Sequence, residues 1–166
     1  MIKIDIDILR AEYIFYENDV YFGKLKMSRL KTEAILYLNS AEYLFKREKN
    51  WEGIFFCPLK DGYDLYAEKP VKPAYDYWIS YQGQKYLLKP GELFRKKTQL
   101  HFELYNGRNI LGSIKNFPKQ DFLCMDFRIK LPKVCKCFIF WLACYSWKNK
   151  KGFVRAKSML GGDIIN

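Results

Sequence analysis

The sequence predicts a mainly β protein: an antiparallel barrel of about twelve strands, in two related halves, that encloses a hydrophobic C-terminal helix. Many short segments before residue 131 alternate apolar and polar residues, which is typical of half-buried strands. A single uncharged segment, residues 137–147, follows them. A barrel of more than about eight strands leaves a lumen that must be filled, and an all-round apolar helix would fill it.

The expected strands are short and are separated by turn signals. Residues 2–8 open the chain with alternating isoleucine and charge, and residues 123–131 form the longest strict alternation. Asn106-Gly107 is the strongest hairpin signal in the chain. No segment before residue 131 requires a helix, although residues 30–38 have room for one or two helical turns. We expect strands near residues 2–8, 12–16, 20–27, 34–38, 41–48, 53–57, 63–68, 75–81, 85–88, 99–104, 110–115 and 123–131.

A faint internal repeat is the basis for two related halves. Shifting the chain by 89 residues places Tyr16 on Tyr105, Gly23 on Gly112 and Lys26 on Lys115. Both segments have the form strand, polar turn, strand with a glycine inside. Glycine in a strand interior often marks a bulge or a close backbone approach.

The apolar segment is expected to be a buried helix over residues 132–149. Pro132 suits the first turn of a helix, and the basic residues after Trp147 suit its last turn. A buried strand is the competing interpretation, but such strands run about 4–8 residues and this segment is longer. It is also shorter than the roughly 20 residues that span a bilayer. We expect one domain, residues 1–151, followed by a tail, residues 152–166; the helix core would comprise Phe138, Trp141, Leu142 and Tyr145.

The residues that usually carry catalysis are scarce. The single histidine, His101, lies in an alternating segment, where we expect an outward-facing polar side chain. The spacing of Cys135, Cys137 and Cys144 is not that of a zinc site, so these thiols are expected to pack in the core. With no secretory signal and an odd number of cysteines, the sequence predicts a reducing, cytoplasmic setting. We expect no enzyme activity, no cofactor and no metal.

The charge is distributed unevenly. Residues 1–83 carry 12 Lys/Arg and 13 Asp/Glu, whereas residues 84–166 carry 17 and 5, so the net charge of +11 comes from the second half. A basic field favours a polyanion as partner, either phospholipid or nucleic acid. The alternative is a lysine-rich surface that only keeps an aromatic-rich protein in solution.

Two basic clusters are the candidate anion-binding residues. Aromatic residues Trp147 and Phe153 are interleaved with the second cluster, a mixture that suits an anionic membrane interface. The same mixture suits single-stranded nucleic acid, because aromatic rings can stack on bases, although no known RNA-binding signature is present. The candidate residues are Arg95, Lys96, Lys97, Lys148, Lys150, Lys151 and Arg155.

The order of elements and the texture FIFWLACYSWKNKK, residues 138–151, resemble the tubby C-terminal-like barrels. That superfamily includes the LURP-one-related proteins and the phospholipid scramblases, and the resemblance implies a helix threaded through a barrel. It covers residues 2–150. Two departures stand out: the chain continues for fifteen residues beyond Lys151, and the phosphoinositide-binding residues of tubby proteins have no assigned counterparts here.

These observations lead to one functional expectation and two alternatives. We expect a non-enzymatic lipid-binding module whose basic C-terminal half contacts an anionic, phosphoinositide-like membrane surface, so that the cytoplasmic protein is peripheral at the membrane. A single-stranded nucleic-acid-binding protein is the first alternative. A protein-interaction scaffold whose basic surface only aids solubility is the second.

Overall fold

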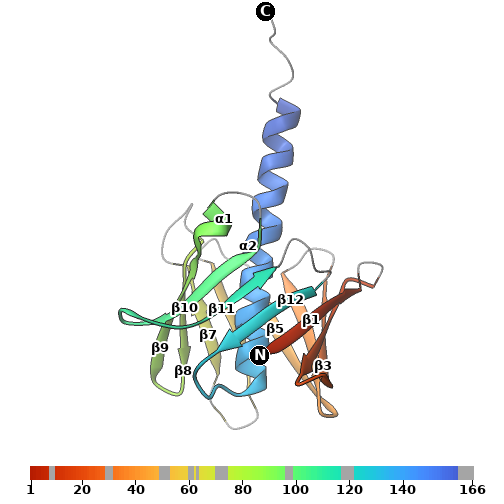
Figure 1. Cartoon of the computed structure of the whole chain (residues 1–166), viewed down its shortest axis with the longest axis vertical. Coiled ribbons are helices and arrows are strands. Elements are labelled where there is room, and N and C mark those ends of the chain that lie inside the picture. The colour runs from red at the N-terminus through yellow and green to blue at the C-terminus, as the bar shows by residue number, and fades with distance from the viewer. Residues whose placement is uncertain are drawn as a thin grey trace, which may run out of the picture.

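The computed structural model contains twelve strands and two helices among the residues it describes (Figure 1). It describes residues 1–7, 10–28, 32–48, 53–59, 62, 64–69, 75–95, 99–116 and 122–160, with the backbone alone for residues 93, 95 and 148–160. The elements are β1 (Ile2–Asp7), β2 (Glu12–Glu17), β3 (Val20–Met27), β4 (Glu33–Leu38), β5 (Ala41–Arg47), β6 (Ile54–Cys57), β7 (Leu65–Glu68), β8 (Tyr77–Tyr81), β9 (Gln84–Pro90), α1 (Glu92–Arg95), β10 (His101–Asn106), β11 (Asn109–Asn116), β12 (Phe122–Phe127) and α2 (Lys133–Leu160).

The strands form one closed antiparallel barrel. Each strand pairs with its neighbours in sequence, and β1 also pairs with β12, with Ile2 opposite Glu17 on one side and Met125 on the other. Alternation gives each strand one apolar face, and closing the sheet turns all these faces inward while pairing the edges. The expected mainly β, twelve-stranded antiparallel barrel is confirmed.

Helix α2 fills the interior of the barrel. The eight consecutive side chains 137–144 are at most 3% exposed, so this stretch is buried on all sides. Phe140 makes an edge contact with Phe15 of β2, and Trp141 contacts Phe45 of β5 and Phe55 of β6. Of the four residues expected in the helix core, Phe138, Trp141 and Leu142 are fully buried, and Tyr145 is half-buried against the core.

The internal repeat relates two three-stranded units. The bounds of β2, β3 and β4, shifted by 89 residues, are the bounds of β10, β11 and β12. Both units carry a register shift at the same place, between Phe15 and Tyr16 and between Leu104 and Tyr105. The two units lie on either side of β1 in the barrel. The repeat therefore relates two sets of three strands, and it does not divide the barrel into two halves of six strands each.

A glycine accompanies the register shift in each unit. A Cβ atom on Gly23 would lie 2.7 Å from the carbonyl oxygen of Tyr37, and one on Gly112 would collide with the carbonyl oxygen of Asp126. The bulged strand approaches its neighbour so closely that only a residue without a side chain fits.

The largest differences from the sequence expectation are in the C-terminal half of the chain. Strand β12 ends at Phe127 rather than near residue 131, because Ile129 and Leu131 pack against the core where the chain turns into the helix. Helix α2 continues to Leu160 rather than ending near residue 149, because lysine and arginine are good helix formers. The short helix α1 was not expected, whereas Glu33–Leu38 form strand β4 in agreement with the expected strand at residues 34–38.

Candidate binding sites at the two rims of the barrel

The two rims of the barrel are distinguished by the path of α2. The helix begins where Lys133 Nζ lies 3.2 Å from Glu17 Oε2 at the end of β2; we call this the lower rim. It leaves the barrel beside α1, where the rings of Trp147 and Phe94 are 5.7 Å apart; we call this the upper rim. Figure 1 shows α2 passing from the lower rim and extending beyond the upper one.

An aromatic cluster surrounds the helix at the upper rim. Phe94 of α1 is 2% exposed and makes edge contacts with Tyr75 and with Phe102 of β10, besides its contact with Trp147. Helix α1 therefore inserts one ring between the barrel wall and α2. This contact positions α1 beside the exit of the long helix.

Arg47, the last residue of β5, links the barrel wall to α2 at this rim. Its Nη1 donates a hydrogen bond of 2.7 Å to Tyr145 Oη, and the guanidinium lies over the ring of Tyr145. Its Nε is buried and has no hydrogen-bond partner among the described residues. The guanidinium thus bonds to the helix through Nη1, whereas the N–H of Nε is a donor without a partner among the described residues.

A groove of about 410 Å³ lies beside Arg47. Two of its lining residues are basic and two are acidic, so its charge is mixed rather than purely cationic. It is lined by Thr32, Glu33, Lys46, Arg47, Glu48 and Phe56. The groove offers hydrogen-bond donors near the point where α2 leaves the barrel, balanced by carboxylates.

The predicted anion-binding residues belong to segments that meet at the upper rim, but their side chains lie outside the described part of the structure. The backbone of Arg95 is in α1, and Lys148, Lys150, Lys151 and Arg155 are positions of α2 beyond Trp147. Lys96 and Lys97 lie outside the described residues. The structure therefore places α1 beside Trp147, after which the outer part of α2 begins, and it does not describe the cationic groups themselves.

The described side chains are almost neutral in sum. They include 15 of the 29 Lys/Arg residues and 14 of the 18 Asp/Glu residues, a net charge of +1. The remaining excess of +10 belongs to the rest of the sequence, mainly to the segment after Trp147 and to the connections between strands. The barrel wall is therefore not the source of the basic character.

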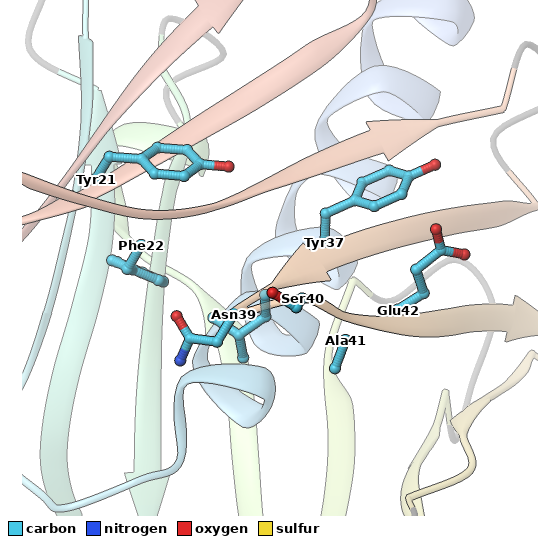
Figure 2. A pocket seen from close by; sticks show the side chains of 8 residues that line it. Tyr21, Phe22, Tyr37, Asn39, Ser40, Ala41 and Glu42 are labelled. Carbon is cyan, nitrogen blue, oxygen red and sulfur yellow. The ribbon is translucent and has the colours of Figure 1, made fainter.

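A second groove, also of about 410 Å³, lies at the lower rim between β3 and the turn that joins β4 to β5. Figure 2 shows Tyr21 and Tyr37 on neighbouring strands, with Asn39 and Ser40 at the turn and Glu42 beyond it. No lysine or arginine is among the described residues that line it. The sequence indicated the turn at Asn39-Ser40, but it gave no sign of the groove.

His101 is buried, although it lies on the outward-facing side of its strand as expected. Phe102 and Leu104 of the same strand face the core, so His101 points outward, yet it is only 6% exposed. The segment at Gly91 covers it so closely that a Cβ on Gly91 would collide with the imidazole. Its Nε2 lies 3.4 Å from Glu103 Oε1, and it lines neither groove.

Burial determines the protonation of His101 and of the thiols. Removal from water, with a smaller contribution from Lys115, lowers the pKa of His101 against the opposing effect of Glu103 and Glu92. Burial raises the pKa of the Cys57 thiol to about 12, and it also raises the pKa of Cys137. All five cysteines are buried and free, so the structure shows them as packed thiols.

Comparison with protein-family models, with curated proteins and with solved structures gave no match. Among the described residues no group of three or more His, Cys, Asp and Glu side chains is arranged to hold a metal ion. None of the described helices has both the length and the hydropathy needed to cross a membrane.

Proposed function

We propose that this protein is a non-enzymatic, tubby-like binding module that attaches to anionic phospholipid surfaces through the upper rim of its barrel. The observation that carries the proposal is the continuation of α2 beyond the barrel. Residues 148–160 extend the helix past the contact between Trp147 and Phe94, and this segment holds five Lys/Arg residues and no acidic residue. Each basic residue near an anionic membrane contributes about 1 kcal/mol of attraction.

Further basic residues occur in connections that join strand ends at the same rim. Besides α1, these are the connections from β3 to β4, from β5 to β6, from β7 to β8 and from β11 to β12. The sequences of these four connections contain Arg29, Lys31, Lys49, Lys69, Lys72 and Lys119 against Glu48, Glu52, Asp76 and Asp121, a net charge of +2. These connections add a small positive charge to that of the helix extension, which supports a polyanionic partner.

The filled interior favours recognition on the outside of the barrel. Side chains 137–144 are at most 3% exposed and occupy the lumen, so a ligand would meet the rims or the outer wall. This supports a surface-binding role over that of a carrier that encloses a small molecule. The absence of a recognised catalytic constellation in the sequence is the reason for proposing binding rather than catalysis.

The architecture supports the tubby-like assignment at the level of the fold. A closed barrel of twelve antiparallel strands with one long C-terminal helix is the arrangement that resemblance to the tubby, LURP-one-related and scramblase proteins implies. Membership of that superfamily and a phosphoinositide-like ligand are parts of the proposal.

The test is co-sedimentation with vesicles of phosphatidylcholine alone and of phosphatidylcholine with phosphatidylserine or a phosphoinositide. We expect binding only to the anionic vesicles. Glutamate at Lys148, Lys150 and Lys151 should weaken it on the order of a hundredfold, from about 1 kcal/mol for each basic residue. Glutamate at Arg95, Lys96 and Lys97 should have a similar effect.

The matched control reverses three exposed basic residues at the lower end of the barrel, Lys85, Arg108 and Lys130, and so changes the net charge equally. Equal loss in the control would contradict an upper-rim site. Gel shifts with single- and double-stranded oligonucleotides run in parallel, because a nucleic-acid binder shows a similar salt dependence. Binding to oligonucleotides alone would favour the first alternative, and binding to neither ligand would leave a protein-interaction scaffold.

A further inference from the structure

The part of α2 beyond the barrel, residues 148–160, has an apolar side and a basic side; we call this part the α2 extension. In an α-helix, positions about seven or eleven residues apart lie on nearly the same side, because about two or three turns separate them. Apolar and small residues recur at this spacing along the α2 extension, and so do basic residues. The apolar side comprises the positions of Gly152, Phe153, Ala156, Met159 and Leu160, the basic side comprises those of Lys148, Lys151 and Arg155, and Lys150 and Lys157 border the apolar side.

The contacts of α2 inside the barrel show above which strands the apolar side lies. Position 156 follows Tyr145 by eleven residues, so both lie on the same side of the helix. Tyr145 accepts a hydrogen bond from Arg47 of β5. The next residue, Ser146, shares a hydrogen bond with Tyr77 of β8. The apolar side of the α2 extension therefore continues the side of the helix that meets β5–β8.

The basic side lies above other elements of the barrel. Position 151 follows Cys144 by seven residues, and the thiol of Cys144 is hydrogen-bonded with Tyr13 of β2. Position 151 also follows Trp147 by four residues, and Trp147 contacts Phe94 of α1. The basic side thus lies above β2 and α1, away from the strands below the apolar side.

The barrel wall below the apolar side carries aromatic residues on its outer surface. Phe56 of β6, Tyr66 of β7 and Trp78 of β8 alternate with buried residues, so all three face outward. Phe56 is opposite Tyr66, and Trp78, which is 40% exposed, is diagonal to Tyr66 across the next strand pair. Lys46 and Glu68 flank these rings, so the wall offers apolar contact rather than net charge. Tryptophan and tyrosine side chains suit a membrane interface, where one end is apolar and the other wet.

The charge and the two-sided pattern of the α2 extension together favour a lipid bilayer as the partner of the apolar side. Five Lys/Arg residues and no acidic residue lie in residues 148–160. A helix with a basic polar side and an apolar side lies in the plane of an anionic membrane, with the apolar side at the boundary of headgroups and acyl chains. A helix that pointed straight into the bilayer would place its cations in hydrocarbon, which is costly.

We propose that the α2 extension is an interfacial helix that lies along the bilayer rather than pointing into it. Its apolar positions enter the boundary between headgroups and acyl chains, and the outer edge of β6–β8 at Trp78 contacts the same surface. The barrel therefore meets the membrane tilted toward β5–β8. This inference rests on the proposed lipid binding, and it adds an oriented apolar contact to the attraction between charges.

The first experiment attaches an environment-sensitive fluorophore to a cysteine introduced into the full chain by Ala156→Cys or by Ser158→Cys. Both natural residues are small; position 156 is on the apolar side, and position 158 follows Trp147 by eleven residues and is on the opposite side. With vesicles of phosphatidylcholine and phosphatidylserine, we expect the emission to shift to the blue at position 156 and to change little at position 158. All five natural cysteines are buried, and wild-type protein treated alike gives the background.

Two pairs of variants test the apolar contact by co-sedimentation with the same vesicles. Phe153→Ala should weaken binding about tenfold because the bilayer covers part of the ring, whereas Val154→Ala, outside the apolar side, should leave it unchanged. Trp78→Ser should weaken binding about threefold to tenfold for the same reason. Its control is Ile110→Ser, because Ile110 is 51% exposed and lies at the lower end of β11, away from the proposed contact.

The outcomes separate this inference from the proposed function. If wild-type protein binds anionic vesicles but the two labels respond alike, or Phe153→Ala binds like Val154→Ala, the interfacial helix is wrong and attraction between charges alone remains. If Trp78→Ser binds like Ile110→Ser, the tilt toward β5–β8 is wrong. If wild-type protein does not bind anionic vesicles, the inference and the proposed lipid binding are both wrong.

Discussion

Trp141 has the largest side chain that the barrel buries completely, and it lies where the helix meets two strands of the wall. Its ring is 5.6 Å from those of both Phe45 and Phe55, and 5.8 Å from that of Phe138. We expect Trp141→Ala to lower the free energy of unfolding by about 3–5 kcal/mol, because the surrounding wall cannot collapse onto the space. Urea denaturation followed by circular dichroism measures this.

The control for that substitution is Trp78→Ala. Trp78 is 40% exposed on β8, so its truncation should cost much less. If the two variants unfolded at the same urea concentration, the interior position of α2 would not be what stabilises the barrel.

His101 predicts a dependence of stability on pH. Burial lowers its pKa below the ordinary value of 6.5, so the folded protein favours the neutral imidazole. The unfolded chain then binds the proton more readily, and the stabilisation present above pH 6.5 is lost as the pH falls through the lower pKa of the folded state. We therefore expect a decrease in unfolding free energy on acidification below about pH 6.5.

Urea titrations across this range, on wild type and on His101→Gln, isolate the contribution of the ring. In the glutamine variant the free energy of unfolding should decrease less steeply as the pH falls just below 6.5, whatever the absolute stability of the variant. Identical slopes in the two proteins would show that His101 titrates alike in the folded and unfolded states.

At the scale of elements, α2 divides into two parts with different roles. The part up to Trp147 fills the barrel and contacts the wall through Arg47, Tyr77 and Phe94, whose partners are Tyr145, Ser146 and Trp147. The part from 148 to 160 extends beyond the upper rim. Stability and the proposed lipid binding therefore depend on separate stretches of one helix.

Truncation separates the two parts. A chain ending after Asn149 keeps every described contact between α2 and the wall, so its melting temperature should stay within a few degrees of wild type. It should also lose most binding to anionic vesicles. A chain ending after Leu131 leaves the lumen empty and should not fold. If the chain that ends after Asn149 were much less stable than wild type, residues 150–166 would contribute to the stability of the barrel.

The repeated elements show how the same strands acquire different surroundings. β4 and β12 are equivalent in length and register, but a two-residue turn follows β4 and a connection to α2 follows β12. In the first unit a groove lies at Tyr21 and Tyr37, whereas in the second the N–H of Arg128 donates a hydrogen bond to the carbonyl oxygen of Leu111.

At the scale of the whole molecule, charge is separated from the core. The described side chains are balanced in sign, whereas the excess belongs to segments attached mainly at the upper rim. Exposed charges are screened over about 10 Å at 0.1 M salt, so attraction at this rim should weaken as salt rises.

The sequence alone determined the class of fold because alternation with a period of two and all-round apolarity are local properties. Residues 20–27 were predicted as a strand and form β3 with those bounds, and the run after Lys136 was predicted as a buried helix. The bulge glycines were visible as a repeat at an offset of 89 residues. The alternation and the apolar run depend only on neighbours in the chain, and the repeat is found by comparing the sequence with itself.

The tertiary structure decided which residues share a site, because that depends on chain segments far apart in sequence. The burial of His101 arises from the segment at Gly91, and the link from Arg47 to α2 joins residues separated by 98 positions. The groove at Tyr21 exists only because β3 runs past the point where β4 turns back. Periodicity shows which face of a strand is buried, but only the closed barrel determines what covers the other face.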